Sequence, residues 1–252
     1  MNFFQDIVYV NKISLKKTLN SFGKNWIIVF TGFVYMLINM LMLLLVSTLF
    51  SGVLSILAGL VIAIIMSSLI SNYLYLLFNI INYDRITWYD FKDGFKFFLW
   101  KVYGIFFIYW IGGYLLSSII AILGINPNLI SFIIGIIIVV CLNPLPETIY
   151  QKSLSSGESL MYTLNFMKEN WINWLIPNII FNLLLYVFTD NWTFNIFTTH
   201  LDFNFGLTAE GLIFYIVGQV LFSFMMIYRG HLYKLLSTST PRKRMYMNKF
   251  YD

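Results

Sequence analysis

Six long runs of apolar residues, separated by short polar connections, dominate the 252-residue chain. A helix needs about 20 predominantly apolar residues to cross roughly 30 Å of hydrocarbon, and all but the fourth run have about that length or more. The pattern predicts an all-α fold, a polytopic membrane bundle of six transmembrane helices. The predicted spans are residues 26–50, 52–81, 97–123, 128–142 (with room for an extension), 171–189 and 207–228.

The lengths of the connections group the spans into three hairpins. The first and third connections, residues 51–52 and 124–127, are short enough to be tight turns. The fifth connection, about residues 190–206, is longer and rich in Phe, Trp, Thr and Asn. We expect it to lie along the outer membrane interface rather than to project into water.

A short motif precedes the first and fifth predicted spans. Residues 14–26 read SLKKTLNSFGKNW and residues 159–171 read SLMYTLNFMKENW, with identical residues at seven of thirteen positions. Residues 87–96, before the third span, are a weaker aromatic and basic echo. The repeat predicts a unit used three times, an amphipathic helix followed by a transmembrane hairpin.

The apolar positions of the motif follow a helical period. Leu15, Leu19 and Phe22 recur at i, i+4 and i+7, and Leu160 and Leu164 repeat the first interval. Such a stripe is typical of a helix that lies in the headgroup plane with its apolar face toward the hydrocarbon. The alternative is that these segments are the cytoplasmic ends of longer helices.

Every Lys and Arg falls on one side of the membrane when the six spans are threaded through it. The N-terminal arm (1–25), the second and fourth connections and the tail (229–252) hold all 16 when Lys101, near the start of the third span, is counted with the second connection, and the other connections hold none. Because Lys and Arg accumulate on the cytoplasmic side, both termini are predicted to be cytoplasmic. We expect one integral membrane domain over residues 1–252, with all six spans between residues 26 and 228.

Composition supports a membrane protein and argues against other classes. The chain is 59% apolar and 11% charged, against about 45–50% and about 25% in soluble domains. Its formal charge of +5 arises from a basic inner face, which suits contact with anionic headgroups. We therefore expect the lipid bilayer as a partner and no nucleic acid. Cys141 is the single cysteine, which excludes an intrachain disulfide and a Cys-based metal cluster.

The helical pattern breaks after the fourth apolar run, where residues 143–147 read NPLPE. Two prolines remove two backbone donors and disfavour helix in the residues before them, so we expect a break near the inner leaflet. Glu147 could bind a cation, relay a proton or pair with Arg229, because broken helices frame binding sites in transporters. The alternative is a simple helix stop, with Glu147 in the first turn of the next helix and Arg229 extended to the headgroups. The candidate functional residues are Asn143, Pro144, Pro146, Glu147 and Arg229.

Polar residues inside the spans are few: Asn39, Asn72, Asn178, Asn182 and Gln219. Asn178 and Asn182 share one helix face, one turn after Pro177. We expect interhelical hydrogen bonds from these amides, and a polar permeation path is the alternative.

The sequence gives no support to catalysis. The two histidines, His200 and His231, fall on opposite predicted sides of the membrane, and the chain has no HExxH, P-loop or GxSxG motif. We expect no enzymatic activity, no metal and no cofactor.

Residues 143–177 and 225–245, the latter containing MMIYRGHLYK and PRKRM, resemble a group of bacterial six-span membrane proteins. These are similar to the membrane domain fused to some glycerophosphodiester phosphodiesterases. The resemblance implies a six-span module with a basic tail in a bacterial membrane. The soluble phosphodiesterase domain has no counterpart in these residues, so hydrolysis is not expected.

Two functions fit these patterns. The first is a non-enzymatic accessory or scaffold protein of the bacterial cytoplasmic membrane, with lipid contact and other membrane proteins as partners. The alternative is the permease subunit of a transporter that uses a separate ATPase, for which residues 87–96 are the candidate coupling helix.

Overall fold

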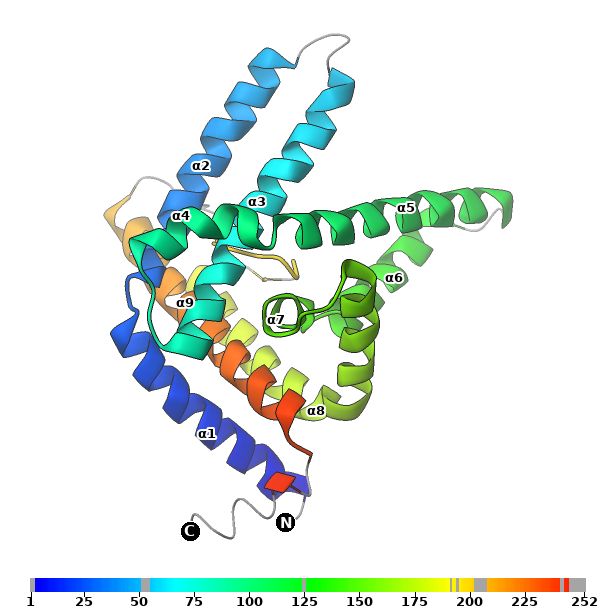
Figure 1. Cartoon of the computed structure of the whole chain (residues 1–252). Helices are drawn as coiled ribbons and strands as arrows, with labels where there is room; N and C mark the ends of the chain where they lie inside the picture. The colour runs from blue at the N-terminus through cyan, green and yellow to red at the C-terminus, as the bar shows by residue number, and fades with distance from the viewer. Residues whose placement is uncertain are drawn as a thin grey trace.

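The computed structural model describes residues 3–50, 55–123, 126–190, 192–193, 195–201, 208–240 and 243–244. These residues form nine α-helices and no strand (Figure 1). In chain order the helices are α1 (Phe3–Lys24), α2 (Ile28–Leu49), α3 (Ser55–Tyr83), α4 (Trp88–Phe97), α5 (Leu99–Leu123), α6 (Pro127–Cys141), α7 (Leu145–Gln151), α8 (Ser156–Thr189) and α9 (Ala209–Thr238). Residues 51–54 and 124–125, which contain most of the two predicted tight turns, lie outside the described residues.

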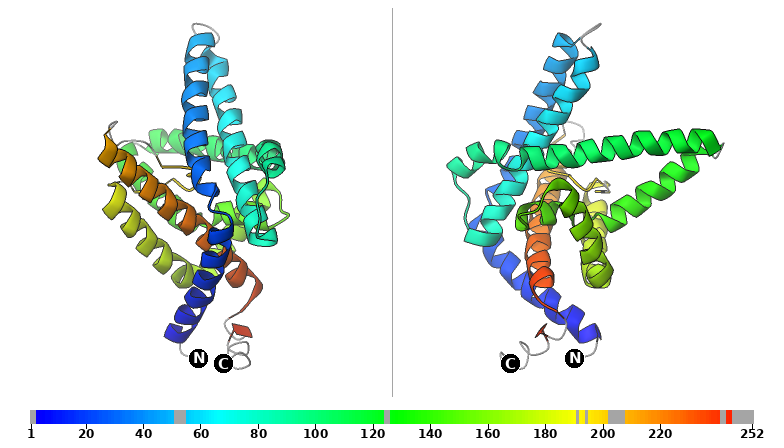
Figure 2. Two further views of the ribbon diagram at one scale, coloured as in Figure 1. Left: turned by 90° about the vertical axis from the view of Figure 1, so that its left-hand side faces the viewer. Right: turned by 45° about the vertical axis from the view of Figure 1, so that its right-hand side comes forward.

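Five helical stretches of the described chain are long and apolar enough to cross a membrane. A sixth is present if α6 and α7, which meet at a bend of 41°, are counted as one span. The prediction of an all-α membrane fold is therefore confirmed. The helices of the α2–α3 pair and of the α8–α9 pair lie side by side, whereas α5 and α6 meet near the tip of their hairpin and diverge from there. The α2–α3 and α5–α6 hairpins point away from the rest of the molecule in different directions (Figures 1 and 2).

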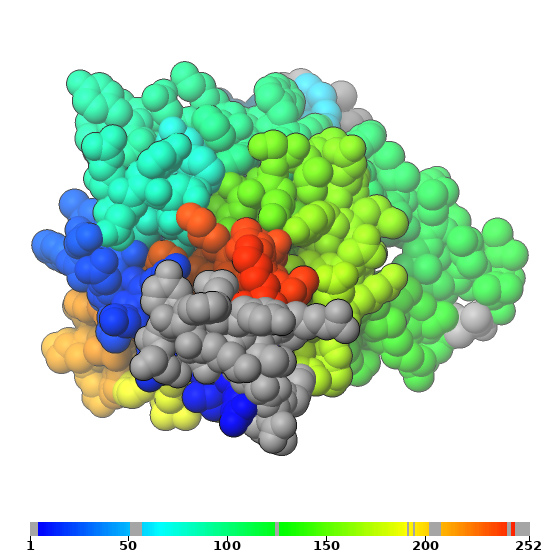
Figure 3. All heavy atoms as spheres, turned by 60° about the horizontal axis from the view of Figure 1, so that its bottom comes forward, coloured from blue at the N-terminus to red at the C-terminus, as the bar shows by residue number. Residues whose placement is uncertain are grey.

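The tightly packed core lies at one end of the hairpins. The second half of α3, the C-terminal half of α9 and nearly all of α7 are buried there, joined by the first turns of α2 and α5. Toward the tips of the α2–α3 and α5–α6 hairpins most apolar side chains are exposed, and α6 has no buried residue. Figure 3 looks onto the packed end, where the last turns of α9 lie between α1, α3–α4 and α7–α8.

The three copies of the predicted unit differ in the structure. Helix α1 ends at Lys24, and a turn at residues 25–27 separates it from α2. The segment before the fifth span is continuous with it: α8 is helical without interruption from Ser156 to Thr189, although its first part and its remainder point in different directions in Figure 1. Helices α4 and α5 are separated by Phe98 alone, and together they count as one apolar stretch, Trp88–Leu123. A separate helix before the span is thus present in the first copy, whereas in the α8 copy the segment is the first part of a longer helix. The interfacial position of these segments stays a prediction.

The identical residues of the motif nevertheless have equivalent local roles. Thr18 donates to the carbonyl of Ser14 at 2.8 Å, and Thr163 donates to the carbonyl of Ser159 at 2.7 Å. All four side chains are buried. The motif therefore encodes a buried face of small polar residues, which lets helices approach closely in a membrane protein.

Helix α1 uses this polar face to pack along α9. Ser14, Thr18 and Ser21 are buried, and the hydroxyl of Ser21 lies 3.0 Å from Nε2 of His231. The predicted apolar stripe lies on another side, where Leu15 and Leu19 are exposed and Phe22 packs against the core.

Ionic contacts fasten both ends of α1. Near its start, Arg244 donates to both carboxylate oxygens of Asp6 at 2.7 Å, in a buried pair. At its end, Lys24 pairs with Asp84, which follows α3. Partial burial alone would raise the pKa of the Asp84 carboxyl, but hydrogen bonds from Lys24 and Ser21 hold it below its usual value.

The C-terminal helix extends beyond the predicted sixth span. Helix α9 continues to Thr238, so residues 229–238 of the predicted tail are helical, and most of them are buried in the core. Beyond this helix, Arg244 of the predicted basic tail is also buried, in its pair with Asp6.

The described part of the fifth connection, residues 192–193 and 195–201, packs against the core at one end. Leu201 is 3% exposed and belongs to the core, and Phe197 packs edge-to-face on Phe106 of α5 at 5.4 Å. Figure 1 shows this segment between α3, α5 and α7. Trp192 is 43% exposed, and the expected position of the connection at the outer interface stays a prediction.

Candidate functional site at the helix break

The predicted break lies between α6 and α7. Helix α6 ends at Cys141, residues 142–144 form a turn, and α7 begins at Leu145. Pro144 is the N-cap of α7, and Pro146 lies in its first turn, where the missing backbone donor removes no helical hydrogen bond. The two prolines thus stop one helix and start the next, as their positions predict.

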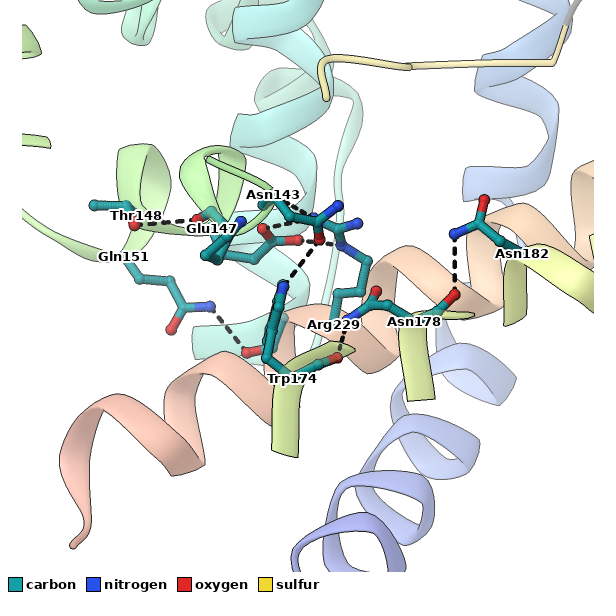
Figure 4. A network of polar contacts seen from close by, with 10 residues as sticks. Asn143, Glu147, Thr148, Gln151, Trp174, Asn178, Asn182 and Arg229 are labelled. Carbon is teal, nitrogen blue, oxygen red and sulfur yellow. Dashed lines mark hydrogen bonds and ion pairs between the residues drawn. The ribbon is translucent and has the colours of Figure 1, made fainter. Parts of the chain in front are cut away.

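Glu147 and Arg229 form a buried ion pair beside this break (Figure 4). Nε of Arg229 donates to Oε1 of Glu147 at 2.7 Å, and Nη2 donates to Oε2 at 3.0 Å. The side chain of Glu147 is fully buried and that of Arg229 is 8% exposed. Arg229 therefore does not extend to the headgroups, because its guanidinium is held by the carboxylate. Glu147 also lies in the first turn of α7. Its pairing with Arg229 and its position at a helix start, which were predicted as alternatives, are therefore both present.

Asn143 and Trp174 complete the surroundings of the guanidinium. The carbonyl of Asn143 accepts a 2.7 Å hydrogen bond from Nη2 of Arg229. The Asn143 side-chain oxygen accepts one from Nε1 of Trp174 at 2.9 Å. The Trp174 ring also lies against the cation, 5.2 Å from its central carbon, a favourable cation–π arrangement. The break, α8 and α9 are thus joined through one arginine.

Further polar contacts fix the short helix α7 to its neighbours. The hydroxyl of Thr148 lies 2.8 Å from that of Tyr233 on α9 and 2.9 Å from that of Thr163 on α8. Gln151 donates to the carbonyl of Gly230 at 2.9 Å. Lys101 of α5 donates to the carbonyls of Ile149 and Lys152, at 2.9 and 2.8 Å. This lysine satisfies carbonyls at the C-terminal end of α7, which a helix leaves unpaired.

Gly230 allows α9 to approach this cluster closely. A Cβ atom there would lie 2.6 Å from the Tyr150 hydroxyl and 2.7 Å from the Ile81 side chain. Both contacts are too short for a real side chain, so the residue next to Arg229 must be glycine for α3, α7 and α9 to meet as they do.

The structure separates the predicted polar residues into two regions. Asn143, Pro144, Pro146, Glu147 and Arg229 come together, whereas Asn182 and Gln219 lie closer to the fifth connection. Gln219 is buried, donates to the Tyr215 hydroxyl at 3.1 Å and packs against Gly32 of α2.

The expectation of interhelical bonds from the asparagines of α8 is wrong. The Asn178 amide donates to the carbonyl of Trp174 at 2.6 Å, and that of Asn182 to the carbonyl of Asn178 at 2.9 Å. Both donations stay within the helix, because a short amide side chain reaches the carbonyl one turn back. The Asn182 oxygen accepts from Thr193 of the fifth connection.

Sequence reasoning missed Trp174, Tyr233 and Lys101. Trp174 follows Trp171 by three residues in a segment where tryptophan is expected at the membrane interface, so its burial gave no distinct signal. Lys101 did give a signal in the sequence. It is the fifth residue of the predicted third span, where a cation requires a partner.

The geometry of the pair indicates a structural role, holding α7 against α9. Both carboxylate oxygens of Glu147 accept hydrogen bonds from one guanidinium, which suits a fixed ion pair better than a cation site. Among the residues that the structure describes, no three His, Cys, Asp or Glu side chains come close enough to hold a metal ion. Comparisons with protein-family models, curated proteins and solved structures found no match.

Proposed function

We propose that this chain is a non-enzymatic scaffold or accessory protein of a bacterial cytoplasmic membrane. Its packed inner end holds three hairpins in fixed positions, and its α5–α6 hairpin contacts lipid and another membrane protein. The resemblance to bacterial six-span modules supports a membrane module, and the phosphodiesterase domain of the similar fusions has no counterpart in the residues that resemble them.

The observation that carries this proposal is a set of unpaired polar tips in the middle of α5. Tyr109, Trp110 and Tyr114 are 64%, 66% and 68% exposed. Their side chains make no hydrogen bond within the described residues. Tyrosine and tryptophan prefer the two membrane interfaces, where the polar tip stays wet. In the middle of a span an unpaired hydroxyl or indole N–H is costly, so a partner helix that accepts these hydrogen bonds would stabilise this face.

Photo-crosslinking in the native membrane tests the proposal. Benzoylphenylalanine at Tyr114 is expected to give a discrete protein adduct that disappears when Tyr109→Leu is added. The matched control is Val187 of α8, which is 73% exposed and should give lipid adducts alone. A photo-crosslinker placed in the identified partner should in turn crosslink to α5. Lipid adducts alone at both positions would contradict the proposal.

One observation favours the permease alternative. Helix α4 is a well-formed helix with a complete capping box between Thr87 and Asp90. Trp88 and Tyr89 on its surface are 65% and 78% exposed, so a soluble partner can reach them. We expect an ATPase gene beside this one, and a crosslink from Tyr89 to its product, if the chain is a permease subunit. A free-standing gene favours the scaffold.

A further inference from the structure

We propose that the fifth connection and the α2–α3 and α5 helices enclose a binding site for a neutral, hydroxyl-rich ligand, a sugar ring. The site is a cavity of about 390 Å³, within the range of about 300–1,000 Å³ typical of small-molecule sites. Neither the scaffold role nor the Glu147–Arg229 pair requires it.

The cavity lies deep between the hairpins rather than at their tips. Its wall includes Asn39, midway along α2, and Leu69 and Ile70, midway along α3. The carbonyl of Leu201 in the fifth connection lies 3.5 Å from the amide nitrogen of Gln219. Gln219 is about 15 Å along α9 from its first residue, at 1.5 Å per residue. The connection therefore re-enters the bundle, and irregular backbone at such depth is tolerated where protein buries it or where it lines a polar cavity.

Asn39 is the residue that most clearly indicates a ligand. It lies in a predicted span, lines the cavity, and makes no hydrogen bond within the described residues. An amide in such a position is costly unless it gains a partner. Other asparagines within the spans have partners in the protein: the amides of Asn72, Asn79, Asn178 and Asn182 donate to carbonyls, and that of Asn173 donates to the carboxylate of Asp6.

The remaining lining defines the class of ligand. The hydroxyls of Thr193 and Thr198 donate within the protein and can accept hydrogen bonds from ligand hydroxyls, and the ring of His200 adds a second polar group. Trp192 and Phe197 add aromatic rings, and Phe106 closes the apolar side. None of the described lining residues is Asp, Glu, Lys or Arg, so a charged ligand would lose hydration without gaining a counter-ion. Amides, hydroxyls and aromatic faces without charge match a sugar ring, which presents hydroxyls at its rim and C–H groups on its faces.

Binding to the full chain in lipid nanodiscs tests this inference. The free probes are glucose, galactose, N-acetylglucosamine and maltose, and calorimetry measures their binding. Glucose 6-phosphate should bind more weakly than glucose. A second arm adds monoglucosyl-diacylglycerol to the nanodisc and measures its retention by native mass spectrometry. Binding of a free sugar identifies a soluble ligand, retention of the glycolipid alone identifies a lipid headgroup, and failure of every probe overturns the proposal.

Matched variants locate the binding. Asn39→Leu should weaken binding of the positive probe by about tenfold, the effect of one lost hydrogen bond. Asn178→Leu, an amide of a span that does not line the cavity, should leave binding unchanged. If Asn39→Leu fails to fold, Thr198→Val replaces it, with Thr48→Val as its control. Unchanged affinity in a folded Asn39→Leu or Thr198→Val protein would also overturn the proposal.

Discussion

The pair between Glu147 and Arg229 fixes the register of α7 against α9. Removing two charges from water costs several kcal/mol per ion, which a good pair roughly repays. The pair is therefore weak as a source of net stability. Its effect is specificity, because any sliding of α9 would leave a buried charge without its partner.

Replacing Glu147 by Gln should strongly destabilise the protein, by about 3–5 kcal/mol, since a buried Arg229 then remains unpaired. The measurement is the unfolding midpoint of the purified chain in one detergent. The double variant Glu147→Leu, Arg229→Met should recover most of the loss, because it removes both charges together. An unchanged midpoint for Glu147→Gln, with unchanged phenotype, would show that the pair has no structural or functional importance.

Helix α1 packs against the protein with its polar face and leaves its apolar face exposed, which hydrophobicity alone does not predict. Its small polar residues Ser14, Thr18 and Ser21 face α9, whereas Leu15 and Leu19 face outward. In water the apolar face would be the buried one. Beside a bilayer the apolar face can meet lipid, and the small residues allow close helix packing.

Two adjacent substitutions distinguish these faces. Thr18→Leu, at a position with no exposed surface, should destabilise the protein by about 1–3 kcal/mol through overpacking. Leu19→Ala, at a position 60% exposed, should change the unfolding midpoint little and should weaken contact with anionic vesicles. Thermal unfolding and vesicle flotation measure the two effects. The reverse pattern would mean that the stripe faces protein.

Most helices and the break between α6 and α7 could be predicted from the sequence, but the length of one helix could not. The NPLPE segment predicted the break because proline constrains the backbone locally. The length of α8 could not be predicted, because the same motif ends a helix at Asn25 and continues it at Asn170. Both asparagines donate to the carbonyl four residues back. The difference is tertiary, because Asn25 also donates to the carbonyl of Asp84 after α3.

The candidate site was predictable in its charged residues and not in their supports. An acid next to a break and an arginine at a span end are rare enough in a membrane sequence to be noticed. Trp174 and the hydroxyls of Thr148 and Tyr233 are ordinary residues there. Only the packing of α7 against α8 and α9 makes them part of the site.

At the scale of the whole molecule, the segregation of Lys and Arg predicts that the packed end faces the cytoplasm. Single cysteines at Asn20, Glu210 and Thr238, each exposed, test this in a Cys141→Ala background. An impermeant maleimide should label only the Glu210 position on intact cells, and all three after lysis. Labelling at Asn20 or Thr238 on intact cells would reverse the topology.

The distance along the chain between Glu147 and Arg229 has a consequence for biosynthesis. The two residues are 82 positions apart, and α9, the last long helix, supplies the arginine. During synthesis the carboxylate therefore enters the membrane well before its partner leaves the ribosome. Until α9 inserts, the Glu147 side chain needs water or another partner in place of Arg229. Closure of the core therefore has to wait for the synthesis of α9, and a chain truncated before α9 would carry an unpaired buried acid.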